Sequence, residues 1–340
     1  MRNDQPHTVS RREFLRCASA FGATSLLPVG NMALAAEPPP EVKKIRLLKL
    51  PAICLAFAYL GEELLRMEGF TEVEYIEMTA NSPSVLLGAG RADIWMDTVP
   101  SVVYSLANSH PVVALGGVHA GCYELFGRGH VRALRDLRGN RVSISTYGGH
   151  EHVFVSSMAA YIGMDPRRDI DWVVAGTTEN AIRAFSEGDA DAFLGFAPQP
   201  QELRARGIGH VIVNTTTDRP WSQYFCCIVV ANREFARANP IATKRTLRAF
   251  LKAADICAEQ PERAARFMTE RGYVSDYQAA LEILSELPYR RWRDASPEDS
   301  LRFHALRLHD VGMISVSPEK LIAQGTDWRH FNELKRELKA

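Results

Sequence analysis

The chain has 340 residues, with 40 basic and 40 acidic side chains and a hydrophobic share of 46%. That length suits one or two domains with sizeable cores, and the balanced charge argues against nucleic acid as a partner. No run of about 18 apolar residues occurs, so the sequence predicts no membrane-spanning helix.

The first 35 residues have the pattern of a twin-arginine export signal. Paired arginines stand in Ser10–Leu15, a short apolar run extends from Cys17 to Val29, and Ala33–Ala35 is a small-x-small cleavage site. The apolar run is too short to span a bilayer. We therefore predict that residues 1–35 are a signal peptide and that the mature protein is soluble in the bacterial periplasm.

Two stretches after the signal alternate strand-like and helix-like segments. In the first stretch the expected strands are 44–50, 72–78, 92–96 and 112–118, and helices lie between them. In the second the expected strands are 122–126, 141–144, 171–175, 192–196, 210–214 and 224–230. This alternation predicts α/β units with mostly parallel sheets and helices on both faces. Four further helices are expected at 241–258, 262–271, 277–286 and 297–311, before an amphipathic tail.

The segment Arg141–Phe154 has the pattern of a buried strand, a glycine turn and the start of a helix. Gly148 and Gly149 permit a sharp turn and the close approach of a ligand. The free N–H groups of a helix that begins at His150 would attract anions or polar oxygens. The alternative is an ordinary connection between a strand and a helix.

Cysteine and histidine spacing gives no sign of a metal centre or a disulfide framework. The five cysteines that follow the signal are odd in number and form no C-x-x-C pair, so we expect most of them to be buried, apolar side chains. His150 and His152 stand two residues apart and would not share a helix face. No catalytic motif occurs, so the sequence predicts no catalytic residue, no metal and no cofactor.

Several motifs resemble those of the solute-binding proteins of ATP-driven nitrate, sulfonate and taurine importers, a superfamily that includes the thiamine-pyrimidine synthases. The motifs are Leu87–Ile94, Leu137–Ile144, Ile162–Ile170, Ala184–Phe193 and Asn232–Pro240. The resemblance implies a type II periplasmic-binding-protein fold, with two doubly wound α/β lobes joined by two crossover strands and a helical C-terminal part. Lobe one would hold residues 41–120 and 227–340, and lobe two residues 121–226.

The same resemblance places a ligand in the cleft, outside the carboxyl ends of the strands. The candidate ligand-binding residues are Ala52, Ile53, Cys54, Thr98, Ser101, Tyr147, Gly148, Gly149, His150, Gln199 and Trp221. The alternatives are plain helix capping for the hydroxyl residues, a solvated surface position for the histidine and glutamine, and core packing for the aromatic residues.

The resemblance implies a monomeric, non-enzymatic protein that captures a small anionic solute of the sulfonate or nitrate class and delivers it to an ABC permease in the inner membrane. One alternative is an enzyme on the same fold, related to the thiamine-pyrimidine synthases. Those synthases are cytosolic and use an iron-binding, cysteine-rich stretch, which this sequence does not show. A ligand-sensing subunit is a further alternative. The ligand stays open among sulfonates, nitrate, pyrimidine precursors and aromatic acids.

Overall fold

The computed structural model describes residues 37–50, 52–79 and 82–339. The predicted export signal, residues 1–35, lies outside the described residues. The chain divides into two units, Met1–Pro38 and Pro39–Ala340, and the account below concerns the second unit.

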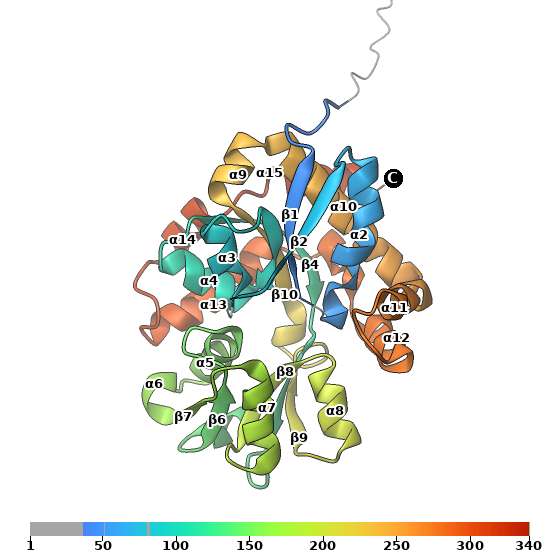
Figure 1. Ribbon diagram of the computed structural model, residues 1–340. Helices are drawn as coiled ribbons and strands as arrows, with labels where there is room; N and C mark the ends of the chain where they lie inside the picture. The colour runs from blue at the N-terminus through green and yellow to red at the C-terminus, as the bar shows by residue number, and fades with distance from the viewer. Residues whose placement is uncertain (1–36, 51, 80–81, 340) are drawn as a thin grey trace, which may run out of the picture. The chain divides into compact units, whose positions relative to one another are not determined.

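The larger lobe contains two small sheets. Strands β1 (Lys44–Lys49) and β2 (Glu72–Glu77) pair in parallel. The second sheet has the order β3-β10-β4, formed by β3 (Ile94–Thr98), β10 (Phe225–Asn232) and β4 (Val112–Ala120). Strand β10 runs antiparallel to both of its neighbours. Figure 1 shows this sheet beside the helices of the N-terminal and C-terminal parts of the chain.

The smaller lobe is built on one five-stranded sheet with the order β7-β6-β8-β5-β9. Its strands are β5 (Tyr123–Gly127), β6 (Arg141–Ile144), β7 (Asp171–Val174), β8 (Ala192–Phe196) and β9 (His210–Asn214). Its helices are α5 (His150–Tyr161), α6 (Pro166–Asp169), α7 (Thr178–Glu187) and α8 (Gln199–Ala205), with a 3-10 turn η2 (Leu134–Leu137). The chain passes between the sheets of the two lobes in residues 121–122 and 215–224.

Antiparallel pairing occurs in both lobes, which differs from the mostly parallel sheets that the alternating pattern predicts. Strand β6 is parallel to β7 and β8, but β5 is antiparallel to β8 and β9. The reason lies in the passage between lobes. A strand that arrives from the other lobe enters its sheet at the edge that faces the cleft. It is therefore antiparallel to the strands whose carboxyl ends point toward the cleft. Strands β5 and β10 are the two strands that enter in this way.

The helices of the larger lobe come from both ends of its sequence. Near the start lie η1 (Ile53–Leu55), α2 (Ala56–Met67), α3 (Pro83–Gly88) and α4 (Val99–Ala107). The C-terminal helices are α9 (Arg233–Ala238), α10 (Pro240–Glu259), α11 (Pro261–Glu270), α12 (Tyr277–Glu286), α13 (Pro297–Asp310), α14 (Pro318–Gly325) and α15 (Arg329–Glu337), with a 3-10 turn η4 (Tyr289–Arg293). The four helices predicted between 241 and 311 are confirmed as α10 to α13.

Side-chain caps set the starts of the C-terminal helices. The Asp276 carboxylate accepts hydrogen bonds from the first-turn N–H groups of α12, and Ser296 and Ser317 cap α13 and α14 in the same way. Helix α13 packs against α4 of the larger lobe and α5 of the smaller lobe. It thereby joins the lobes on one side, and a continuous buried hydrophobic cluster contains residues of both.

Candidate ligand-binding pocket

A pocket of about 400 Å³ has walls from both lobes. Strands β1, β2, β3, β7 and β8 all reach it with their carboxyl ends, through the residues that end or directly follow them. This is the edge at which ligands bind in open α/β sheets. The lining residues are Leu50, Ala52, Cys54, Leu55, Met78, Thr79, Pro83, Met96, Asp97, Thr98, Tyr123, His150, Thr177, Thr178, Glu179, Phe196, Gln199 and Cys227.

On the larger-lobe side, Asp97 organises the start of two helices. Its carboxylate is only 4% exposed. One oxygen accepts from the hydroxyl groups of Ser82 and Ser84, each at 2.7 Å, and from the Ser84 N–H at 3.0 Å. The other accepts from the Thr98 N–H at 2.7 Å. Burial raises the pKa of Asp97, and the four hydrogen bonds act against that shift by stabilising the carboxylate. The charge is therefore used within the protein to hold the starts of α3 and α4 together.

On the smaller-lobe side, Glu151 in the first turn of α5 is the buried carboxylate that joins neighbouring elements. It is fully buried and accepts hydrogen bonds from Ser145 Oγ at 2.7 Å and Thr178 Oγ1 at 2.9 Å. These contacts tie the end of β6 and the start of α7 to α5. The Nε2 atom of His150 lies 3.2 Å from a Glu151 carboxylate oxygen, outside hydrogen-bond geometry.

Three helices of eight residues or more begin at the pocket. Helix α4 begins after its cap Thr98, α5 begins with His150, and α7 begins with Thr178, and all three residues line the pocket. The first-turn N–H groups of a helix have no partner within the helix and carry the positive end of its dipole. The convergence of three such ends favours an oxygen-rich or anionic group in the pocket.

The remaining wall is apolar and aromatic. It is formed by Leu50, Leu55, Met78, Met96, Tyr123 and Phe196. The imidazole of His150 packs against both aromatic rings, with its centroid 6.0 Å from that of Tyr123 and 5.6 Å from that of Phe196, and these two rings also contact each other at 5.6 Å. Such a surface suits the carbon skeleton of an organic molecule.

Five of the eleven predicted binding residues line this pocket, namely Ala52, Cys54, Thr98, His150 and Gln199. Thr98 lines the pocket and is also a helix cap, because its Oγ1 accepts the Ser101 N–H at 3.4 Å. Gln199 is held in place, since its Oε1 accepts a hydrogen bond from the Phe196 N–H at 3.2 Å.

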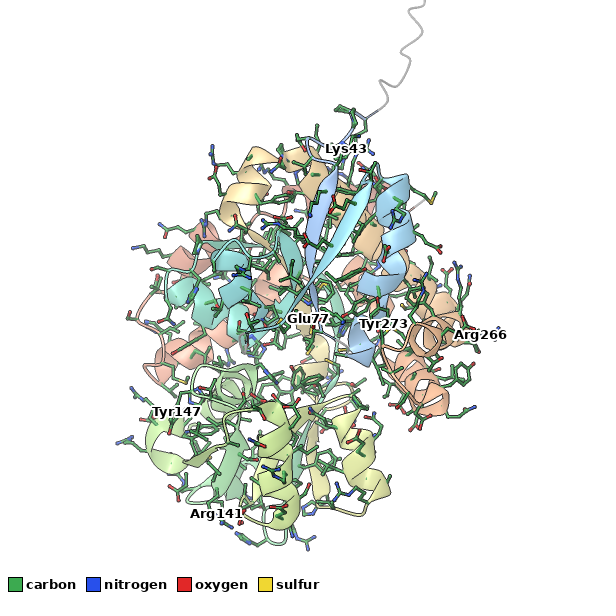
Figure 2. All side chains as sticks on the ribbon, in the orientation of Figure 1. Lys43, Glu77, Arg141, Tyr147, Arg266 and Tyr273 are labelled. Atoms are coloured by element: carbon green, nitrogen blue, oxygen red, sulfur yellow. The ribbon has the colours of Figure 1, made fainter. Side chains whose placement is uncertain are left out.

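The other six predicted residues do not line the pocket. Ile53 and Ser101 are buried, and the Ser101 hydroxyl accepts a hydrogen bond from Thr98 Oγ1 at 2.8 Å. Tyr147 is 61% exposed and lies on the surface of the smaller lobe, as Figure 2 shows. Trp221 is 5% exposed and packs edge-on against Tyr161 and Phe303, which places it where α5 meets α13.

Gly148 and Gly149, the last two of the six, serve the turn before α5. Gly148 has a φ of 77°, which favours glycine. A β-carbon on Gly149 would lie 3.1 Å from the Thr146 carbonyl oxygen and 3.2 Å from Ser145 Oγ. A side chain larger than hydrogen at Gly149 would therefore disturb the turn itself.

Several lining residues were not among the candidates drawn from sequence. Thr177, Thr178 and Glu179 follow β7 and open α7, so the reasoning that selected the segment after β6 would have found them. Apolar residues such as Leu50, Met78 and Met96 carry no such signal, because a pocket wall and a core have the same composition.

In the described part of the chain, none of the helices has both the length and the hydrophobicity to cross a membrane.

Solved structures with the same architecture include periplasmic binding proteins. The periplasmic nitrate-binding protein NrtA from Synechocystis PCC 6803 superposes with a TM-score of 0.74 at 15% identity, covering 89% of this chain and 90% of that one. The alkanesulfonate-binding protein SsuA from Xanthomonas axonopodis pv. citri, bound to MOPS, gives a TM-score of 0.69 at 17% identity, covering 86% and 100%. The two-lobed fold with its cleft pocket is therefore the type II periplasmic-binding-protein fold.

Sequence comparison identifies the family within that class. Residues 68–264, more than half of the chain, match the family model described as NMT1/THI5 like, and the chain belongs to this family. A curated relative is the 4-amino-5-hydroxymethyl-2-methylpyrimidine phosphate synthase of Candida albicans (strain WO-1), which is 22% identical over 221 residues. That match covers 59% of this chain and 64% of the relative, which is less than two thirds of its length.

Proposed function

We propose that this protein is an extracytoplasmic solute-binding protein that captures a small organic solute with an anionic, oxygen-rich head group and delivers it to an ABC import permease. The observation that carries the proposal is the pocket between the lobes, where the starts of α4, α5 and α7 meet an apolar and aromatic wall. Export by the twin-arginine pathway to the periplasm is part of the same proposal.

The helix starts favour an anion even though acidic side chains lie nearby. No lysine or arginine lines the described pocket. The Asp97 carboxylate is already saturated by four hydrogen bonds from its own lobe. Glu179 lies in the first turn of α7, where it interacts favourably with the helix dipole. The first-turn N–H groups that the caps Thr98 and Thr177 leave unbonded are thus the donors that a head group would meet, together with the His150 ring.

The pocket's size and lining favour an organic solute over bare nitrate. Its volume of about 400 Å³ lies in the range of small-molecule sites. A three-oxygen inorganic anion would leave Leu55, Met96 and Phe196 without a partner. We therefore propose an organic anion of the sulfonate type, rather than nitrate, as the ligand.

A thermal-shift screen of the mature protein tests the ligand class. The panel contains benzenesulfonate, butanesulfonate, benzoate, nitrate and the uncharged 4-amino-5-hydroxymethyl-2-methylpyrimidine. We expect one of the organic anions to raise the melting temperature by several degrees, because ligand that binds only the folded state stabilises it by mass action. Stabilisation by nitrate alone, or by the uncharged pyrimidine alone, would overturn the proposed head group.

Transport needs a separate test in the producing bacterium. Deletion of the gene should abolish high-affinity uptake of the radiolabelled screening hit, and a plasmid copy should restore it. Unchanged uptake in the deletion strain would contradict delivery to a permease while leaving the binding result intact.

An enzyme is the second candidate function, favoured by the curated relative whose name is a pyrimidine phosphate synthase. Equilibrium titration followed by mass spectrometry separates the two. A binding protein returns the screening hit unchanged after prolonged incubation, whereas an enzyme converts it. Recovery of a converted product above the level of a heat-denatured control would favour the synthase.

A further inference from the structure

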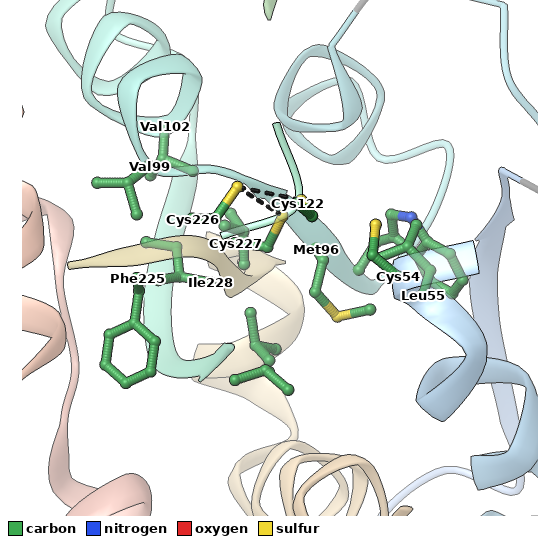
Figure 3. Packing of buried hydrophobic residues seen from close by; sticks show 14 of the residues in the cluster. Cys54, Leu55, Met96, Val99, Val102, Cys122, Phe225, Cys226, Cys227 and Ile228 are labelled. Atoms are coloured by element: carbon green, nitrogen blue, oxygen red, sulfur yellow. Dashed lines mark hydrogen bonds between the residues drawn. The ribbon is translucent and has the colours of Figure 1, made fainter. Parts of the chain in front are cut away.

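Four cysteines and one histidine from three distant parts of the sequence come together beside the pocket. Cys54 lies in η1, His119 in β4, Cys122 in the link between the lobes, and Cys226 and Cys227 at the start of β10. The ligand atoms of Cys54, His119 and Cys122 lie within 4.8 Å of one another, and so do those of Cys122, Cys226 and Cys227. Figure 3 shows the sulfur atoms of Cys122, Cys226 and Cys227 facing one another.

The sulfur separations match those of a metal-thiolate site. The Cys122 and Cys226 sulfur atoms are 3.3 Å apart, and those of Cys226 and Cys227 are 3.8 Å apart. Two thiolates on one tetrahedral zinc ion, with bonds of about 2.3 Å, stand roughly 3.8 Å apart. The cluster therefore needs only small adjustments to surround an ion.

The orientation of His119 is that of a metal ligand. Its side chain is fully buried, and its Nδ1 lies 3.2 Å from the carbonyl oxygen of Ala120. A carbonyl only accepts, so Nδ1 carries the proton of that hydrogen bond. Among the described residues, none forms a hydrogen bond with Nε2. Metal-bound histidines in proteins use the same arrangement, in which one ring nitrogen donates to a carbonyl and the other binds the ion.

Cys122 is common to both groups of ligands and has an unusual backbone. Its φ is 89°, a conformation that only one other non-glycine residue, Ser109, shares in the described chain. Its N–H donates to Thr216 Oγ1 at 3.2 Å, which helps to hold this conformation. Strained residues of this kind persist where the surrounding structure needs a side chain in one place, and they cluster at functional sites.

Plain apolar packing does not account for the cluster. Cys257, the fifth cysteine of the described chain, shows what such packing looks like, because it is fully buried in α10 and belongs to neither ligand group. Cys54 and Cys122 instead lie beside the imidazole of His119, whose Nε2 has no hydrogen-bond partner among the described residues. Cys54 and Cys227 also line the ligand pocket.

We propose that Cys54, His119 and Cys122 bind one thiophilic metal ion of the Zn²⁺ type, with one of the adjacent pair Cys226 and Cys227 as the fourth ligand. Thiolate and imidazole ligands select such ions over Mg²⁺ or Ca²⁺. The ion would lie at the wall of the pocket, next to the bound solute. This site does not depend on the function proposed above, because it rests on a separate set of side chains.

Cobalt binding tests the site on the mature protein, purified with its thiols reduced and then freed of reductant under anaerobic conditions. We expect one equivalent of Co²⁺ to give a near-ultraviolet thiolate-to-cobalt charge-transfer band, and one equivalent of Zn²⁺ to abolish it. The Cys122→Ser variant should bind at least 100-fold more weakly. The matched control Cys257→Ser removes a buried thiol outside the cluster and should bind as the wild type does.

Two results would overturn the site. One is a wild-type protein with five reduced thiols that gives no charge-transfer band, and this result remains decisive even if Cys122→Ser fails to fold. The other is an equal loss of cobalt binding in Cys257→Ser and Cys122→Ser. Circular dichroism of each variant confirms that the comparison is made between folded proteins.

Discussion

At the scale of single residues, one buried histidine gives the protein a property that its sequence context hides. His304 on α13 is fully buried, and its Nδ1 lies 2.7 Å from the hydroxyl oxygen of Ser157 on α5. Burial, together with the positive charge of Arg307, lowers the pKa of His304 to about 3. This neutral histidine joins the two lobes where α13 meets α5.

The His304 pKa predicts a loss of stability in acid. The folded state keeps His304 neutral, so its contribution is complete above the unfolded pKa of about 6.5 and is lost as the pH falls toward 3. Between pH 7 and pH 5, we expect the wild type to lose about 2 kcal/mol more unfolding free energy than the His304→Gln variant. Urea unfolding at both pH values measures the difference, and parallel losses in the two proteins would contradict it.

The proposed export signal, which lies outside the described residues, provides a second prediction about single residues. The paired arginines Arg11 and Arg12 are the recognition element of a twin-arginine signal. An Arg11→Lys, Arg12→Lys double variant should stay in the cytoplasm, whereas the control Arg16→Lys should reach the periplasm. Cell fractionation with immunoblotting decides, and normal periplasmic levels of the double variant would rule out the twin-arginine pathway.

At the scale of elements, buried carboxylates connect helix starts to strand ends. Asp97 joins the starts of α3 and α4, and Glu151 joins α5, α7 and the end of β6. The pocket is thus shaped by two hydrogen-bonded junctions, one in each lobe.

Replacing Asp97 by asparagine tests the larger-lobe junction. Both carboxylate oxygens of Asp97 accept hydrogen bonds, whereas an asparagine amide has only one oxygen that can accept. Its NH₂ group would therefore face either the Thr98 N–H or the donors of Ser82 and Ser84. We expect a loss of about 1–3 kcal/mol in unfolding free energy, the cost of leaving buried donors without partners. Asp171→Asn, at an exposed position, is the matched control and should change stability by less than about 0.5 kcal/mol. Equal stability of Asp97→Asn and wild type would show that the junction is dispensable.

Local sequence patterns were sufficient for the elements but not for the pocket. Helices α10 to α13 and the strand before Gly148 could be predicted because periodicity, caps and turns act over a few residues. Trp221 and the cysteines could not be placed in this way. Trp221 packs against Phe303, and Cys226 lies next to Cys122, and in both pairs the two residues are more than 50 positions apart in the sequence. The antiparallel entry of β5 and β10 likewise follows from the path of the whole chain.

At the scale of the whole molecule, the proposed function requires movement of the lobes. Only residues 121–122 and 215–224 link the two sets of strands, and α13 packs against α5 on one side. A bound solute that contacts both walls would favour the closed arrangement.

Small-angle X-ray scattering measures that closure. We expect the radius of gyration to decrease when the best-binding solute of the screen is added at saturation, and to stay the same with a non-binding member of the panel. An unchanged radius at saturation would indicate a rigid site that does not couple to lobe movement.

The proposed ligand site is the pocket between the lobes, and isothermal titration calorimetry of three proteins determines whether the ligand binds there. Thr79 follows β2 at the pocket and is exposed, while Thr71 precedes β2 and is also exposed, away from the pocket lining. We predict that Thr79→Trp, which fills the pocket, weakens binding of the organic anion at least 100-fold. The matched control Thr71→Trp should bind with the affinity of the wild type. Wild-type affinity in Thr79→Trp, with its fold intact by circular dichroism, would place the ligand elsewhere and contradict the account.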